Sequence, residues 1–371
     1  MLFYFGWHYN ARFTNAVGSH TAKEFFLSWE IIASIVLFTL ITGLRYHTGW
    51  DHECYIRDYV QYQTHGTIYR PDFEPGFRLI ETIFAKLGCH YSVFFGFLGF
   101  VNVFFLYLGL RKQRETLPWM GICMMMGMFY IHLMNSIRQG VVECVFVAML
   151  LLIENRKYLW YFAISLALVT IHKVALLLIP LFFVANFSLK IKWKWALLSG
   201  YVVCFVLGQF PELFSWTINA NSKILDLLGY SKYVELFNHN ANYAFHRSPI
   251  GFMTISIMLV HLALIFYYPK MKEFFKGNRF FSMTYRLSYF YICFFVLALN
   301  TAKYFKRPSE LTLPFFVIAV AFLMVYLLKK KAYLPLAILL LLNVSITVST
   351  HIKCYLHTSD YLSTYLYHFL P

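Results

Sequence analysis

The chain has 371 residues, of which 60% are hydrophobic, 20% aromatic and only 13% charged. A soluble domain is roughly 45–50% apolar and about 25% charged, so this composition excludes a single water-soluble core as well as disordered, fibrous and disulfide-scaffold classes. The net charge of +15 would indicate a nucleic-acid partner in a soluble protein. Here the basic residues stand in loops between apolar runs, where they set membrane topology. We therefore expect an all-α polytopic membrane protein with no nucleic-acid partner.

Apolar runs of about 17–25 residues predict transmembrane helices, and in chain order they give about eleven spans. The apolar stretch 158–187 is divided at His172-Lys173, because the positively charged loops then alternate and share one side of the membrane. The predicted spans are 26–45, 91–110, 117–135, 139–153, 158–171, 174–187, 195–210, 250–268, 283–300, 311–328 and 332–349.

This alternation predicts a single integral domain, 1–371, in the cytoplasmic (inner) membrane, with the amino terminus inside and the carboxyl terminus outside. Residues 1–25 lack the features of a signal peptide and are too polar for a span. Two long connections, 46–90 and 211–249, carry apolar residues at helical spacing. We expect both to be ordered, partly amphipathic external loops.

Several cations stand on the predicted outer side, against the usual distribution of Lys and Arg. Arginine forms a planar fork that binds phosphate through two hydrogen bonds, so anion binding is the simplest explanation. The alternative is that these side chains reach lipid headgroups. The residues are Arg45, Arg57, Arg70, Arg78, Arg138, Lys173, Arg247, Lys303, Lys306 and Arg307.

A polar stripe crosses the tight apolar hairpin around residue 137. Asn135, Arg138 and Gln139 share one face of a continuing helix, and His132 and Glu143 extend that face by one turn each way. Polar side chains at membrane depth are costly unless they face protein or a water-filled cavity. The stripe therefore faces inward, either as a binding site or as a polar cluster that packs helices together.

Three residues are candidates for a general base. His172 stands beside Lys173, whose charge favours a neutral imidazole that can accept a proton; the alternative is a histidine at a helix end that faces headgroups. Asp51 and Glu74 lie in the first external loop, where they are a base, ligands for sugar hydroxyls or plain salt bridges. The seven cysteines form no CxxC pair and no phosphate-binding glycine loop occurs, so we expect no metal and no cofactor.

Six motifs in this order resemble the EpsG-like family of Wzy-type polymerases, which join exopolysaccharide, capsule and O-antigen repeat units. The resemblance covers about residues 40 to 325, although family members usually begin with a further span before the first motif. The motifs are GLRY with the following Asp (43–51), EPGF (74–77), NSIRQG (135–140), IHKVALLLIP (171–180), GYSKYVELF (229–237) and YFKRP (304–308).

The resemblance implies a GT-C-like, metal-independent glycosyltransferase that polymerises undecaprenyl-pyrophosphate-linked oligosaccharides at the outer membrane face. Membrane lipid and a chain-length regulator are further expected partners. We expect His172, Asp51 or Glu74 to act as base. The expected pyrophosphate ligands are Arg45, Arg138, Gln139, Lys173, Lys303 and Arg307.

Three other functions remain open, namely an O-antigen-type ligase, a membrane polysaccharide acyltransferase and a lipid-linked oligosaccharide flippase. A shared pyrophosphate site requires four basic residues to line one outward-facing pocket that is open sideways to lipid. These are Arg45, Arg138, His172 and Arg307.

Overall fold

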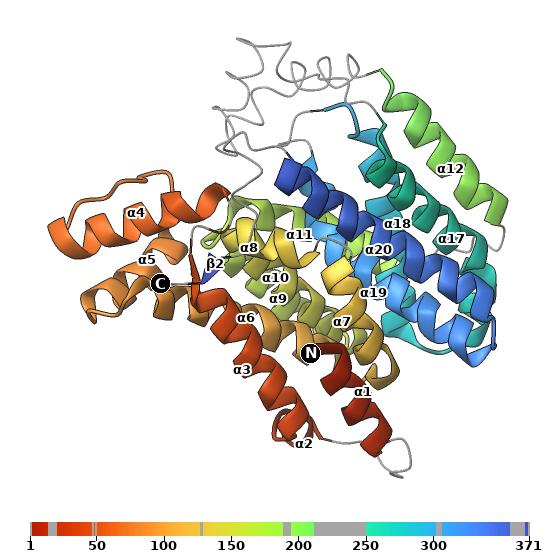
Figure 1. Cartoon of the computed structure of the whole chain (residues 1–371), viewed down its shortest axis with the longest axis horizontal. Coiled ribbons are helices and arrows are strands. Elements are labelled where there is room, and N and C mark those ends of the chain that lie inside the picture. Colours follow the sequence, from red (N-terminus) through yellow and green to blue (C-terminus); the bar gives the residue numbers. More distant parts are fainter. Residues whose placement is uncertain are drawn as a thin grey trace.

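The computed structural model describes residues 2–13, 21–46, 48, 50–126, 129–187, 194–210, 250–301, 306–356 and 368–369. This part of the chain is built from helices, apart from one antiparallel pair of short strands, β1 (Arg45–Tyr46) and β2 (His368–Phe369) (Figure 1). The predicted all-α class is therefore confirmed. The predicted external loop 211–249 lies outside the described residues.

The helices of the described residues lie in this order along the chain. They are α1 (Leu2–Phe13), α2 (Ala22–Phe26), α3 (Trp29–Gly43), α4 (Trp50–His65), α5 (Pro75–Lys86), α6 (Tyr91–Leu110), η1 (Arg114–Thr116), α7 (Leu117–Met126), α8 (Phe129–Asn135), α9 (Ile137–Glu154), α10 (Tyr158–Val169), η2 (Lys173–Leu177), α11 (Leu178–Asn186), α12 (Lys194–Leu207), α17 (Phe252–Phe274), α18 (Arg279–Leu297), α19 (Arg307–Lys329) and α20 (Tyr333–Leu356).

The chain is a multi-pass membrane protein. Within the described residues, α6, α17, α18 and α19 are long and apolar enough to cross a membrane, and α7 with α8 makes a fifth candidate if the bent pair counts as one span. Five further apolar helices are shorter. The count of about eleven spans therefore stays a prediction.

One predicted break and one predicted continuous helix can be compared with the structure. The expected interruption at His172-Lys173 is present, because α10 ends at Val169 and a 3-10 helix begins at Lys173. The expected continuous helix 117–135 is instead two helices, α7 and α8, bent by 68°. Apolar periodicity marks which residues are helical but carries no signal for a bend between two apolar pieces.

Helices α9 and α19 form the centre of the molecule. Every residue of α19 from Leu311 to Leu327 is buried, and α7, α9 and α18 pack around it. Helix α9 has 18 residues and is about 27 Å long at 1.5 Å per residue. Its two ends therefore mark two separate ends of the bundle.

The basic connections meet at the carboxyl end of α9. Lys112 lies 3.9 Å from the Glu154 carboxylate, and Arg279 donates to the Glu154 carbonyl at 3.0 Å. Asn278 donates to Gln113 at 2.9 Å. Loops that are separate in sequence but rich in Lys and Arg thus share one end of the bundle, as expected of loops that stay in the cytoplasm.

Close packing of α3 on α6 sets where β1 begins. A Cβ atom on Gly43 would lie 2.7 Å from the Ser92 carbonyl oxygen, and one on Gly99 would lie 2.6 Å from Thr42 Cβ. Only glycine allows the two backbones to approach so closely. Because α3 ends at Gly43, this contact delivers Arg45 directly to the end of the bundle opposite the basic loops.

The amino-terminal helix is too short to cross a membrane. Helix α1 has 12 residues, about 18 Å, and it packs against α3 and α7. The fully buried carboxylate of Glu30 binds His8 at 3.0 Å and Arg12 at 3.4 Å. A buried charge needs such partners, so this contact ties α1 to α3.

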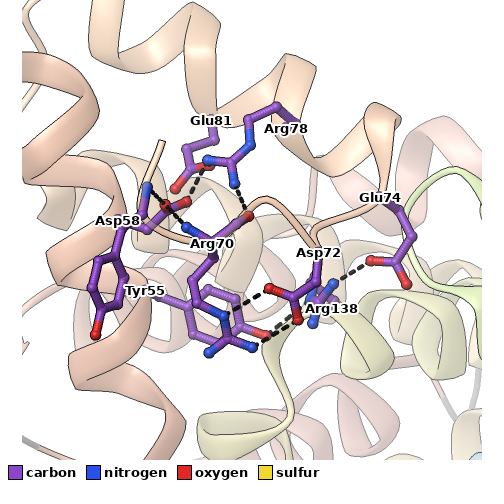
Figure 2. A network of polar contacts seen from close by, with 9 residues as sticks. Tyr55, Asp58, Arg70, Asp72, Glu74, Arg78, Glu81 and Arg138 are labelled. Atoms are coloured by element: carbon purple, nitrogen blue, oxygen red, sulfur yellow. Dashed lines mark hydrogen bonds and ion pairs between the residues drawn. The ribbon is translucent and has the colours of Figure 1, made fainter. Parts of the chain in front are cut away.

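The segment 46–90 projects from the bundle as α4 and α5 (Figure 1) and is held together by buried carboxylates (Figure 2). Asp58 accepts hydrogen bonds from the backbone N–H groups of Tyr69 and Arg70 at 2.8 and 2.7 Å and also pairs with Arg78. Arg78 pairs in addition with Glu81 at 2.6 Å. Since the Asp58 and Glu81 side chains are fully buried, the two carboxylates share one guanidinium.

We predict that Glu81→Gln stabilises the protein more at pH 8 than at pH 5. Burial and the Asp58 carboxylate outweigh the attraction of Arg78 and raise the pKa of Glu81 to about 8. The folded state therefore keeps a proton that the unfolded state loses above about pH 4.5, and stability falls as pH rises through this window. Melting curves of the purified protein should show a gain of about 2–4 °C at pH 8.

The control is Glu115→Gln, which removes a half-exposed pair with Lys329 at the other end of the bundle. Its small effect should be equal at both pH values. A Glu81→Gln variant that is less stable than the wild type at pH 8 would show that Glu81 is held ionised by Arg78.

Candidate functional site

The junction of α8 and α9, residues 134–139, gathers side chains and backbone from four distant parts of the chain. The partners come from β1, the start of α4, the start of α5 and the start of α19. The contacts are Arg45 with Met134, Asp51 with Asn135, Glu74 with Arg138 and Arg307 with Gln139. The helix expected to continue through the polar stripe is instead broken at Ser136, between α8 and α9, and Asn135, Arg138 and Gln139 lie on the two sides of this break.

Arg138 is fixed in place on every side. Its guanidinium pairs with Glu74, and its Nε donates to the Tyr55 hydroxyl at 3.0 Å (Figure 2). Its Cζ lies 4.3 Å from the centre of the Phe73 ring. The aromatic face supplies cation–π attraction. The side chain is 14% exposed, so this guanidinium is oriented but not sealed from a ligand.

Glu74 joins the EPGF motif to the break between α10 and η2. It is the N-cap residue of α5, and its Oε1 accepts the Lys173 backbone N–H at 3.0 Å. The backbone N–H groups of Gly76 and Phe77 donate to the Thr170 carbonyl at 2.8 and 3.1 Å, and a Cβ on Gly76 would collide with Thr170. Because both oxygens of Glu74 are engaged, this carboxylate organises the site rather than serving as a free base.

His172 is neutral and its tautomer follows from its contacts. Its Nδ1 accepts the Val174 backbone N–H at 3.3 Å, as N-cap of η2. The ring proton therefore resides on Nε2, and the 3.5 Å between Nδ1 and Glu74 joins two acceptors. Burial, and next the charge of Arg138, hold the pKa of His172 well below its usual range. His172 thus offers an N–H donor, which weakens the sequence-based interpretation as a base.

Arg307 approaches the same place from α19. Its guanidinium donates to the Oε1 of the fully buried Gln139, its Nε lies 3.8 Å from Glu310, and its side chain is 25% exposed. Gln139 directly follows Arg138 in sequence. The amino-terminal ends of α9 and α19, neither with a side-chain cap, add their positive dipole ends to these two arginines.

Asp51 is the carboxylate that the site leaves available. Its backbone N–H donates to Asn135 Oδ1 at 3.2 Å, and it stands one helical turn before Tyr55 on the same face of α4. Among the described residues, its half-buried side chain has no hydrogen bond or ion pair. Asp51 therefore fits the role of a base better than Glu74 or His172.

Arg45 does not share the exposed position of Arg138 and Arg307. It is 1% exposed, it donates to the Met134 carbonyl, and it stacks 5.3 Å from the Phe95 ring. The close crossing of α3 on α6 and the pairing of β1 with β2 turn this side chain inward. We therefore regard Arg45 as a support for the end of α8 rather than a pyrophosphate ligand.

The two remaining predicted ligands are Lys173 and Lys303. Lys173 contributes its backbone N–H to Glu74, and Lys303 lies outside the described residues. Tyr55, Phe73 and Glu310 contact the site arginines and were missed. The sequence could have indicated Tyr55, because it stands four residues after Asp51 and so lies on the same helix face. For Phe73 and Glu310 the sequence offers no indication apart from the motif residues beside them. The opening sideways to lipid stays a prediction.

Comparison with known proteins identifies the family. A family model matches residues 29–367, described as the EpsG family. The match includes every motif at the α8–α9 junction and the helices that carry them. No curated protein and no solved structure matches the chain significantly. The family match covers most of the chain, and the protein therefore belongs to the EpsG family.

Proposed function

We propose that this protein is a polymerase that joins undecaprenyl-pyrophosphate-linked oligosaccharide repeat units at the outer face of the cytoplasmic membrane. Family membership supports an exopolysaccharide-related membrane polymerase. The observation that carries the proposal is that two arginines lie at one helix end: Arg138 belongs to the first turn of α9, and Arg307 binds the next residue, Gln139. Both are oriented by partners and both are partly exposed. Two oriented guanidiniums suit the paired charges of a pyrophosphate.

The reaction is a glycosyl transfer between two lipid-linked substrates. A hydroxyl of the incoming repeat unit attacks the anomeric carbon of the growing glycan and forms the new glycosidic bond. The bond between that carbon and the pyrophosphate oxygen breaks, and lipid pyrophosphate leaves with the electron pair. Asp51 takes the proton of the attacking hydroxyl.

The leaving group needs stabilisation rather than protonation, since pyrophosphate is a stable anion. Arg138 and Arg307 supply charge-assisted donors, and His172 adds an Nε2–H without adding charge. Their shielding from water strengthens the attraction to charge that develops in the transition state. Glu74 and Gln139 hold the two arginines so that little reorganisation is needed.

The competing functions make different use of the same chain. A flippase needs charges along several helices at mid-depth, whereas here Arg138 and Arg307 lie at the bundle end that contains the amino termini of α9 and α19. An acyltransferase needs a His–acid pair reachable from the cytoplasm. A ligase shares the donor chemistry and differs only in the acceptor.

A deletion strain that accumulates single repeat units on the outer leaflet would favour a polymerase, and accumulation on the inner leaflet would favour a flippase.

The proposed orientation can be tested by cysteine labelling. In a background without reactive native cysteines, His65→Cys on the exposed end of α4 should react with an impermeant thiol reagent added to intact cells. Gln113→Cys, among the basic loops, should react only after permeabilisation. Reversed labelling would place the arginine site in the cytoplasm and overturn the outer-face proposal.

Arg138→Lys should abolish or strongly reduce polymer while the protein remains inserted at normal abundance. Lysine keeps the charge but loses the planar fork that binds Glu74, Tyr55 and phosphate together. We expect a loss of roughly 10²-fold or more in polymerisation rate. Arg111→Lys, at the basic end, is the matched control and should be silent. Equal effects of both variants would contradict phosphate recognition by Arg138.

Asp51→Asn should reduce kcat by roughly 10²–10⁴-fold with little change in abundance, as removal of a general base does. Asp72→Asn is the control, because Asp72 forms a partly exposed bidentate pair with Arg70 at 2.8 and 2.9 Å, and such pairs contribute about 1 kcal/mol or less. Its rate should stay within about twofold of the wild type. Full activity of Asp51→Asn would show that another group is the base.

A further inference from the structure

A second polar layer lies one helical turn below the site arginines. Glu143 follows Gln139 by one turn of α9, and both are fully buried. Glu143 Oε1 accepts a hydrogen bond from Gln139 Nε2 at 2.8 Å and one from His132 Nε2 at 2.8 Å. This layer does not contact the proposed substrate position, so the reaction as derived above leaves it without a role.

The contacts determine which way the Gln139 amide points. A carboxylate oxygen accepts hydrogen bonds, whereas an amide has one accepting and one donating end. The NH₂ of Gln139 donates to Glu143 at 2.8 Å and, in a longer contact of 3.4 Å, to Glu310 Oε2, so its Oε1 faces Arg307 and accepts from the guanidinium. Reversal of the amide would set two donors against each other at Arg307 and two acceptors against each other at Glu143.

A purely structural role explains Glu143 poorly. Its second oxygen, Oε2, is buried and has no hydrogen-bond partner among the described residues. An unsatisfied polar atom in a protein interior costs about 1–3 kcal/mol, and an apolar residue would avoid that cost on a central helix. Local rules are broken in this way where function requires it.

We propose that Glu143, held by His132, is a positioning residue that sets the Gln139 amide and thereby aims Arg307 at the pyrophosphate of the lipid carrier. This inference rests on the proposed function, because it acts through the anion that Arg307 binds. It goes beyond that function in assigning a task to two residues inside the bundle that touch no substrate.

The test measures binding of undecaprenyl pyrophosphate to the full-length protein in lipid nanodiscs. Glu143→Gln keeps the size of the side chain but offers both a donor and an acceptor to Gln139, so the shortest contact of the amide NH₂ no longer selects one orientation and only the 3.4 Å contact with Glu310 does. We expect about a fivefold to tenfold higher Kd. Arg307→Ala should raise Kd by about 10- to 100-fold, the value of a charge-assisted hydrogen bond.

The double variant separates positioning from general stability. If Glu143 acts through Arg307, then Glu143→Gln adds nothing to the Kd of Arg307→Ala. Glu154→Gln, the same substitution at the other end of α9, should leave Kd within about twofold of the wild type. Additive effects in the double variant, or a silent Glu143→Gln, would overturn the positioning role while the pyrophosphate site stands. Unchanged binding in Arg307→Ala would overturn the site itself.

Discussion

The ion pair between the partly exposed Arg138 and the buried Glu74 is the interaction on which the arrangement of the site depends. It joins the start of α9 to the start of α5, and through the Lys173 backbone N–H it also joins the break before η2. Loss of one partner from a buried pair costs about 3–5 kcal/mol, because the other charge is left without compensation. The projecting segment, the central helix and the broken hairpin are therefore positioned together.

This dependence explains why the motifs are short and scattered. The motifs among the described residues supply single contacts rather than a complete site, as those of Arg45, Asp51 and Arg307 with the α8–α9 junction show. The glycine of EPGF permits close contact with Thr170, and the glycines of α3 and α6 permit the crossing that delivers β1. The close packing that glycine allows and the ion pairs of the arginines thus fix the same arrangement of helix ends.

The site combines two charged arginines with one neutral histidine. Arg138 and Arg307 carry the positive charge, and each is countered by a carboxylate, Glu74 or Glu310. His172 stays neutral because burial and its cationic neighbours depress its pKa. Pairing each guanidinium with a carboxylate avoids the cost of unpaired cations near a low-dielectric membrane.

The sequence by itself determined the membrane class and the helical break near His172, whereas the helix expected to continue through Asn135, Arg138 and Gln139 is broken at Ser136. The first two follow from apolar run length, which is a local property of the chain. Only the tertiary structure decided that Arg45 is buried, that Glu74 is occupied by Arg138, that His172 carries its proton on Nε2, and that Asp51 remains available. Those outcomes depend on which distant helix ends meet, and that is settled by long-range packing such as the glycine crossing of α3 on α6, for which a single sequence contains no periodic signal.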